Sequence, residues 1–177
     1  MYEEGSVVRE MKHPFRPDRV FRRVSDITPE ILREMGIRAL LCDLDNTLVK
    51  PHRKRPTPGA AAWLMSMHEA GIRVMLVSNN SMKRVREFCR DLPFEGMPQA
   101  RKPLPFGLTR GRRALGASAA ETAFLGDQLF TDILGARLAG VTALYVRPLD
   151  PEKGWFFGLK RRLERPFLRG LEPEEPK

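Results

Sequence analysis

Long apolar runs that stop at polar residues organise this chain. One run leads into "DLDNT" at 43–47, and others are "IRVMLVS" at 72–78, "ETAFLGD" at 121–127 and "VTALYVRP" at 141–148. Because these runs lack polar–apolar alternation, they predict strands buried on both faces, as in a parallel sheet. A shorter extended piece is expected in "FEGMPQA" at 94–100.

Helices are predicted between these strands. Thr57 is a candidate N-cap ahead of Pro58, and Gly71 suits the end of the helix that follows. Further helices are expected at 82–92, 105–116 and 131–140. Strands that alternate with helices indicate βαβ units, so the sequence predicts an α/β fold, a doubly wound (Rossmann-like) parallel sheet with helices on both faces.

The length of 177 residues fits one domain over 1–177. We divide it into an N-terminal lead-in of helix and turn at 1–37, a catalytic core at 38–147, and a basic, apolar C-terminal segment at 148–177. No run approaches the ~18–20 consecutive apolar residues of a membrane span. The N-terminus carries acids and lacks a signal-peptide core, so a cytoplasmic location is predicted.

Positive charge is concentrated in the middle of the chain. The net charge is +9. Residues 48–113 contain fourteen Lys or Arg and only four acids, whereas the basic and acidic residues of 1–37 are equal in number. One interpretation is an ordinary basic surface. The other is attraction to an anion: a phosphate, a nucleic acid or an acidic membrane face.

Polar side chains stand where each predicted strand ends. Asp43 and Asp45 follow the first strand, Ser78 and Asn79 the second, and Asp127 a later one. Each group alone fits a solvated turn or a helix cap. In a doubly wound sheet, however, the carboxyl ends of the strands meet at one edge, where ligands bind.

The four motifs resemble those of the haloacid dehalogenase (HAD) superfamily of phosphohydrolases. They are "DLDNT" at 43–47, "SNN" at 78–80, "RKP" at 101–103 and "GDQLFTD" at 126–132, in the family's order. The resemblance covers residues 38–146. It implies a HAD core and a phosphatase mechanism.

The resemblance also implies a role for each site residue. Asp43 would be the nucleophile that forms an aspartyl-phosphate, and Asp45 the general acid and base. Magnesium would be held by Asp43, Asp127 and the backbone carbonyl of Asp45, with Asp132 supporting the metal from an outer shell. Four residues would bind the phosphate: Thr47, Ser78, Asn79 and Lys102.

The spacing of the motifs leaves no room for a cap domain over the site. About ten residues follow Thr47 before the next helix, and twenty-one separate Asn80 from Lys102, whereas even small domains need ~40 residues. An open site suits a phosphate displayed on something large. The basic clusters "HRKR" at 52–55 and "KRVR" at 83–86 should flank its entrance.

The C-terminal segment "GWFFGLKRRLERPFLRG" at 154–170 mixes aromatic and basic residues. It fits either an amphipathic helix at a membrane surface or a helix packed on its own core. With the motifs and the lead-in "FRPDRVFRRVSDITPEIL" at 15–32, it resembles the capless YqeG-type subfamily (IIIA), which is related to phosphatidylglycerophosphate phosphatases. That resemblance implies removal of the terminal phosphate from phosphatidylglycerophosphate, an anionic phospholipid, to give phosphatidylglycerol. It also implies peripheral contact with the inner face of the membrane.

Two rival functions remain open. One is a soluble HAD phosphatase that acts on sugar phosphates, nucleotides or phosphoproteins. The other is a nucleic-acid-binding protein with a vestigial site. We expect no nucleic-acid partner, because aromatic residues do not alternate with the mid-chain basic residues as a stacking platform would require.

Overall fold

The computed structural model describes residues 13–150, 155–171 and 173–174, and it describes the side chains of the last helix only from Arg162 onward. The elements, in chain order, are β1 (Arg19–Phe21), the 3₁₀ turn η1 (Val24–Asp26), α1 (Pro29–Glu34), β2 (Ala39–Cys42), α2 (Pro58–Glu69), β3 (Arg73–Val77), α3 (Met82–Cys89), β4 (Glu95–Met97), α4 (Phe106–Ala114), β5 (Thr122–Gly126), the π-helical turn η2 (Leu129–Ile133), α5 (Leu134–Leu138), β6 (Thr142–Val146) and α6 (Trp155–Leu168).

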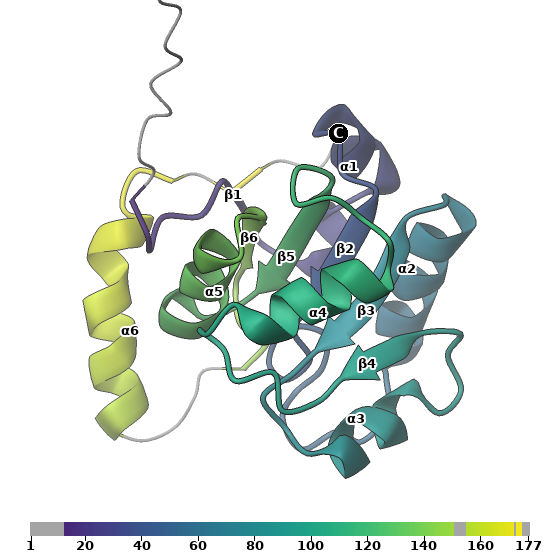
Figure 1. Ribbon diagram of the computed structural model, residues 1–177. Coiled ribbons are helices and arrows are strands. Elements are labelled where there is room, and N and C mark those ends of the chain that lie inside the picture. The colour runs from purple at the N-terminus through teal and green to yellow at the C-terminus, as the bar shows by residue number, and fades with distance from the viewer. Residues whose placement is uncertain (1–12, 151–154, 172, 175–177) are drawn as a thin grey trace, which may run out of the picture.

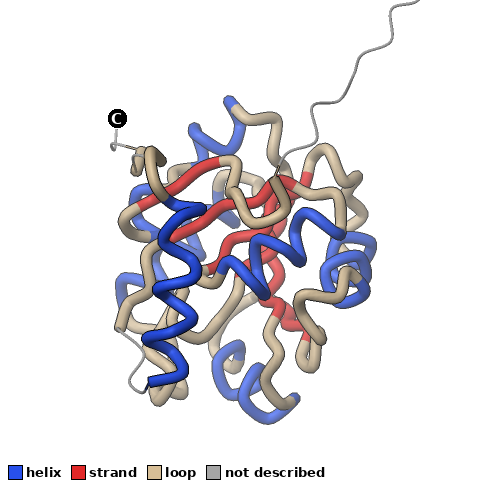
Figure 2. The backbone as a smooth tube through the Cα atoms, turned by 90° about the vertical axis from the view of Figure 1, so that its left-hand side faces the viewer, coloured by secondary structure: helices blue, strands red, loops and turns tan. Residues whose placement is uncertain are grey.

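The six strands form one parallel sheet in the order β1-β6-β5-β2-β3-β4 (Figure 1). Helices lie on both sides of it (Figure 2). α1, α2 and α3 pack on one face, and α4, α5 and the end of α6 on the other. This arrangement confirms the predicted doubly wound fold. The chain leaves β2 toward β3 and later returns to β5 on the other side of β2, so the strand order switches direction at β2 and β5.

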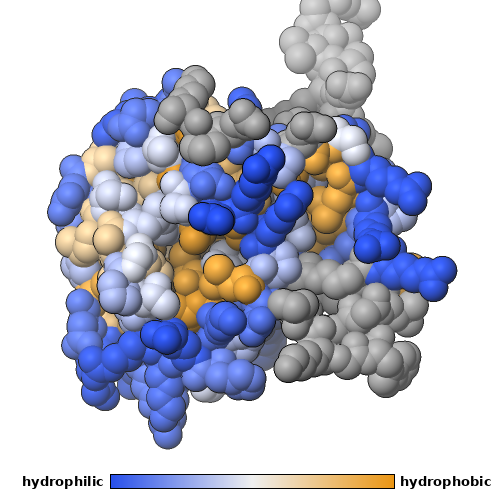
Figure 3. Space-filling model, turned by 180° about the vertical axis from the view of Figure 1, so that it is seen from behind, coloured by the Kyte–Doolittle hydropathy of each residue, from blue (hydrophilic) through white to orange (hydrophobic). Residues whose placement is uncertain are grey.

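No helix among the described residues is long and apolar enough to cross a bilayer. The side of the molecule opposite to the view of Figure 1 is mostly hydrophilic, with a hydrophobic area near its centre (Figure 3).

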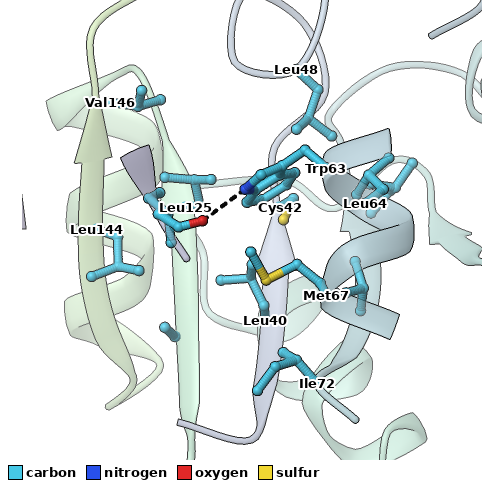
Figure 4. Packing of buried hydrophobic residues seen from close by; sticks show 14 of the residues in the cluster. Leu40, Cys42, Leu48, Trp63, Leu64, Met67, Ile72, Leu125, Leu144 and Val146 are labelled. Carbon is cyan, nitrogen blue, oxygen red and sulfur yellow. Dashed lines mark hydrogen bonds between the residues drawn. The ribbon is translucent and has the colours of Figure 1, made fainter. Parts of the chain in front are cut away.

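The core forms because the central strands are buried on both faces. Leu41 of β2 lies between Met75 of β3 and Phe124 of β5 in the sheet register. On the α2 side, Trp63 packs into the larger apolar cluster, and its indole Nε1 donates a hydrogen bond of 2.8 Å to the Ile27 carbonyl (Figure 4). That bond satisfies the one polar group of a buried tryptophan.

The helix caps follow the predicted chemistry. The Thr57 side chain accepts from the backbone N–H of Ala60 at 3.1 Å, ahead of Pro58. Ser81 caps α3 in the same way, accepting from Arg84 N at 3.3 Å.

The lead-in differs from the prediction of a helix and a turn, because it also contains β1. Val20 of β1 is in register with Tyr145 of β6, and the backbone N–H of Glu174 donates to the Val20 carbonyl at 2.8 Å. A strand of three residues is too short to show a periodic pattern, so its partner strand decides its conformation.

The described part of α6 packs on the rest of the molecule rather than standing free. Phe167 lies 5.3 Å from the ring of Phe15, Glu164 is buried, and Leu163 is exposed. The aromatic residues 155–157, on which the membrane interpretation also depended, lie outside the described side chains.

Candidate active site

The polar residues that end the strands gather at the carboxyl edge of the sheet. The backbone N–H of Asp43 donates to the Leu125 carbonyl at 2.8 Å, so Asp43 continues β2 beside β5. The Lys102 ammonium lies 2.5 Å from Asp43 Oδ1 and 2.8 Å from Asp132 Oδ1. All three side chains are buried. The third and fourth motifs are therefore brought to Asp43 by the fold.

Burial perturbs the ionisation of this pair. It is the main cause that raises the pKa of Asp43 to about 6; Lys102 opposes the rise and Asp132 adds to it. Burial also acts to lower the pKa of Lys102, but the carboxylates of Asp132 and Asp43 outweigh it and hold that pKa above its ordinary value. Lys102 is therefore a cation at neutral pH.

Asp43, Asp127 and Asp132 form a compact acidic cluster. Each offers a carboxylate oxygen, and these oxygens lie within 4.8 Å of one another. Thr47 Oγ1 donates to Asp127 Oδ1 at 3.3 Å and orients that carboxylate. Buried carboxylates so close together repel, and oxygen ligands suit Mg²⁺. The cluster can therefore hold a divalent cation.

The cluster differs in one respect from the predicted metal set of Asp43, Asp45 and Asp127. Asp132, assigned to an outer shell, places its carboxylate beside the other two. For Asp45 the predicted metal ligand was only the backbone carbonyl, and the Asp45 side chain is hydrogen-bonded to Arg84 and Asn80 instead.

The Asp45 carboxylate is held by two residues that follow β3. Arg84 donates to Asp45 Oδ1 from Nη2 at 2.7 Å and from Nε at 3.2 Å. Asn80 Nδ2 donates to the other oxygen, Oδ2, at 2.6 Å. Side-chain exposure is only 14% for Arg84 and 17% for Asp45, so this pair is better shielded than an ordinary surface ion pair.

The second motif links β3 to the lysine loop. Asn79 forms a reciprocal pair with the Lys102 backbone: its Nδ2 donates to the carbonyl at 3.0 Å, and its Oδ1 accepts from the N–H at 2.7 Å. Ser78 is buried, and its Oγ accepts from Asn80 N at 3.1 Å. Asn79 therefore positions Lys102, while the phosphate-binding roles of both residues stay predictions.

Comparisons with known proteins agree with this arrangement. Residues 51–140 match the model of the haloacid dehalogenase-like hydrolase family. The chain is 35% identical over 162 residues to "Probable phosphatase YqeG" of Bacillus subtilis. The alignment covers 92% of this chain and 94% of the relative. The chain belongs to the haloacid dehalogenase-like hydrolases. The predicted family and enzyme class, a HAD phosphatase, are confirmed.

Two solved structures of other proteins share this fold. The cobalt-bound deoxy-D-mannose-octulosonate 8-phosphate phosphatase of Haemophilus influenzae aligns with a TM-score of 0.53 at 13% identity, covering 76% of this chain and 89% of that one. CbbY of Rhodobacter sphaeroides, in complex with xylulose-(1,5)bisphosphate, aligns with a TM-score of 0.51 at 16% identity, covering 63% and 86%. At these identities the likeness concerns the fold alone.

No separate lid covers the HAD site among the described residues. The segment between β2 and α2 is a loop, and the segment between β3 and β4 contains only α3. This agrees with the predicted absence of a cap domain.

Three residues of this site, Asn46, Asn80 and Arg84, were not among the site residues predicted from the sequence. Arg84 appeared only as one member of a basic cluster, because nothing in its spacing reveals a contact with Asp45. Asn46 has a φ of 69°, and its side chain forms a reciprocal pair with the Asp150 backbone, with both bonds 2.9 Å long. An asparagine between two apolar stretches is the one signal for such a left-handed position.

Proposed function

We propose that this phosphatase is a magnesium-dependent phosphomonoesterase that works through an aspartyl-phosphate at Asp43 and removes the terminal phosphate of phosphatidylglycerophosphate. The observation that carries the catalytic part is the buried Asp43–Lys102 pair beside Asp127 and Asp132.

The proposed reaction has two steps. Asp43 attacks phosphorus while the bond to the leaving oxygen breaks, and Asp45 gives that oxygen its proton. Asp45 then takes a proton from water, which attacks the same phosphorus and releases inorganic phosphate and free Asp43. Lys102 stabilises the charge that develops on the phosphoryl oxygens, and Thr47, Ser78 and Asn79 help to hold them.

The acidic cluster supplies the metal ligands in this proposal. Asp43, Asp127 and the Asp45 backbone carbonyl would hold Mg²⁺, with Asp132 supporting them. When bound, the ion would offset the repulsion between the carboxylates and the phosphate. The excess of buried carboxylates around one ammonium supports the presence of a cation.

The substrate proposal depends on the openness and charge of the surroundings. A site with no lid among the described residues suits a phosphate carried at a bilayer surface. Residues 48–113, which include Ser78, Asn79 and Lys102, also carry the basic excess of the chain, and such an excess attracts an anionic headgroup. The cytoplasmic location and the contact with the inner membrane face belong to this proposal.

The experiment is a phosphate-release screen in magnesium buffer. It compares phosphatidylglycerophosphate in detergent micelles with sugar phosphates, nucleotides and phosphopeptides, using Asp43→Asn as the inactive control. The proposal expects the lipid to be turned over with the highest kcat/KM. A soluble phosphate preferred by orders of magnitude would instead favour a soluble phosphatase. An Asp43→Asn rate within about tenfold of wild type, ~1.4 kcal/mol of barrier, would remove the nucleophile assignment.

A further inference from the structure

An apolar pocket of about 420 Å³ is lined in part by Leu48 and Val49, which follow the catalytic loop in the chain. η1, the loop after β2, the start of α2 and Leu149 line it. Its apolar wall includes Leu48, Val49 and Trp63. Leu149, at the edge of the pocket, is 42% exposed.

The wall of this pocket is continuous with the catalytic loop. The Val49 carbonyl accepts from Asn46 N at 2.7 Å, and Leu149 N donates to the Asn46 carbonyl at 2.9 Å. A ligand in the pocket would therefore contact Leu48 and Val49, in the segment that is hydrogen-bonded to Asn46 beside Asp45.

Basic side chains surround the apolar interior. Arg23, Lys50 and Arg53 are exposed and line the pocket. Lys50 is paired with Asp150 at 3.4 Å. The guanidinium groups of Arg23 and Arg53 form no ion pair with the described residues, although the Asp26 carboxylate accepts from the Arg23 backbone N–H at 2.9 Å. The Trp63 indole N–H is already bonded to the Ile27 carbonyl, so it offers no donor to a polar ligand.

An apolar interior with a largely basic rim complements an amphiphilic anion. A nucleotide or sugar phosphate would leave its polar body against leucine, valine and tryptophan. We infer that the pocket binds one acyl chain of an anionic glycerophospholipid, with the headgroup phosphate at Arg23 and Arg53. This inference rests on the proposed lipid substrate and adds a binding site for its acyl chain.

Trp63 provides a direct probe of occupancy. The chain has two tryptophans, Trp63 and Trp155, so Trp155→Phe leaves the pocket residue as the sole fluorophore. We expect monomeric lysophosphatidylglycerol with a brominated acyl chain to quench this fluorescence saturably. The matching brominated lysophosphatidylcholine, which carries no net charge, should need a severalfold higher concentration.

A larger side chain placed in the pocket tests whether the acyl chain of the lipid enters it. A Cβ at Gly59 would meet no atom within 4 Å, so Gly59→Phe can be accommodated and should raise the half-quenching concentration at least about tenfold. Ala62→Phe, on the exposed side of the same helix, is the matched control and should leave it unchanged. Circular dichroism checks the fold, and Gly59→Leu is the smaller alternative.

The rim is tested separately. The double change Arg23→Ala with Arg53→Ala should weaken quenching severalfold, whereas Arg110→Ala with Arg113→Ala removes the same charge elsewhere and should not. Absent quenching, equal quenching by the two lipids, or quenching unaffected by Gly59→Phe would each overturn the inference. Quenching measures binding without hydrolysis. A failure of the inferred lipid binding can therefore be told apart from a failure of the phosphate-release screen.

Discussion

Asp45 is held by neighbours that restrict its carboxylate to one orientation. Arg84 binds one oxygen through two nitrogens, and Asn80 binds the other. A general acid must present its proton to the leaving oxygen with correct geometry. Arg84 is therefore a positioning residue for the proposed acid.

Arg84→Ala should lower kcat by about tenfold, ~1.4 kcal/mol of barrier, through misplacement of Asp45. The loss should be larger for an alkyl phosphate than for p-nitrophenyl phosphate, whose leaving group needs little protonation. Arg86→Ala, an exposed neighbour on α3, is the matched control. Equal losses for the two substrates would indicate a general structural defect instead.

The acidic cluster gives a second prediction at this scale. Magnesium should raise the melting temperature of the wild-type protein, because a ligand that binds only the folded state stabilises it. Asp127→Asn should remove most of this shift, whereas Asp91→Asn, at an exposed surface pair with Arg55, should retain it. Differential scanning fluorimetry across a magnesium titration measures both. An unchanged shift in Asp127→Asn would place the ion elsewhere.

The sequence predicted which residues reach the site better than what each one contacts there. Asp43 and Asp127 were identifiable because they end apolar strands that a parallel sheet brings together. The contact between Arg84 and Asp45 spans 39 positions and depends on the angle of α3, which no local pattern encodes. The pairing of Asn79 with the Lys102 backbone is hidden for the same reason.

Single elements show where local pattern gives way to tertiary contacts. The helix expected at 131–140 begins instead at Leu129 with the π turn η2, which brings Asp132 to Lys102. The Leu129 backbone N–H donates to the buried Glu164 carboxylate of α6 at 3.1 Å. Since Glu164 comes 35 residues later in the chain, the local sequence could not reveal this early start.

Glu164→Ala should destabilise the protein by about 1–3 kcal/mol, because it leaves the Leu129 N–H buried without its acceptor. Activity should also fall, since η2 positions Asp132. Glu164→Gln keeps an acceptor oxygen and should be milder in both respects. Chemical denaturation and steady-state kinetics measure the two effects. If Glu164→Ala unfolded at the wild-type denaturant concentration, α6 would contribute little to the position of η2.

At the scale of the whole molecule, the basic excess predicts reversible membrane attachment. Each Lys or Arg near an anionic surface contributes ~1 kcal/mol, and the attraction weakens with salt. The protein should sediment with vesicles rich in phosphatidylglycerol, be released by high salt, and stay in the supernatant with neutral vesicles. Equal binding to neutral vesicles would show that charge does not drive attachment.

The central claim is covalent catalysis by Asp43, and trapping the intermediate tests it most directly. Asp45→Asn removes the proposed base, so hydrolysis of the aspartyl-phosphate should slow more than its formation from a substrate with a good leaving group. Acid quenching after mixing with ³²P-labelled p-nitrophenyl phosphate, followed by peptide mapping, should place the label on Asp43. A label on another residue, or full turnover by the Asp43→Asn,Asp45→Asn double variant, would contradict the account.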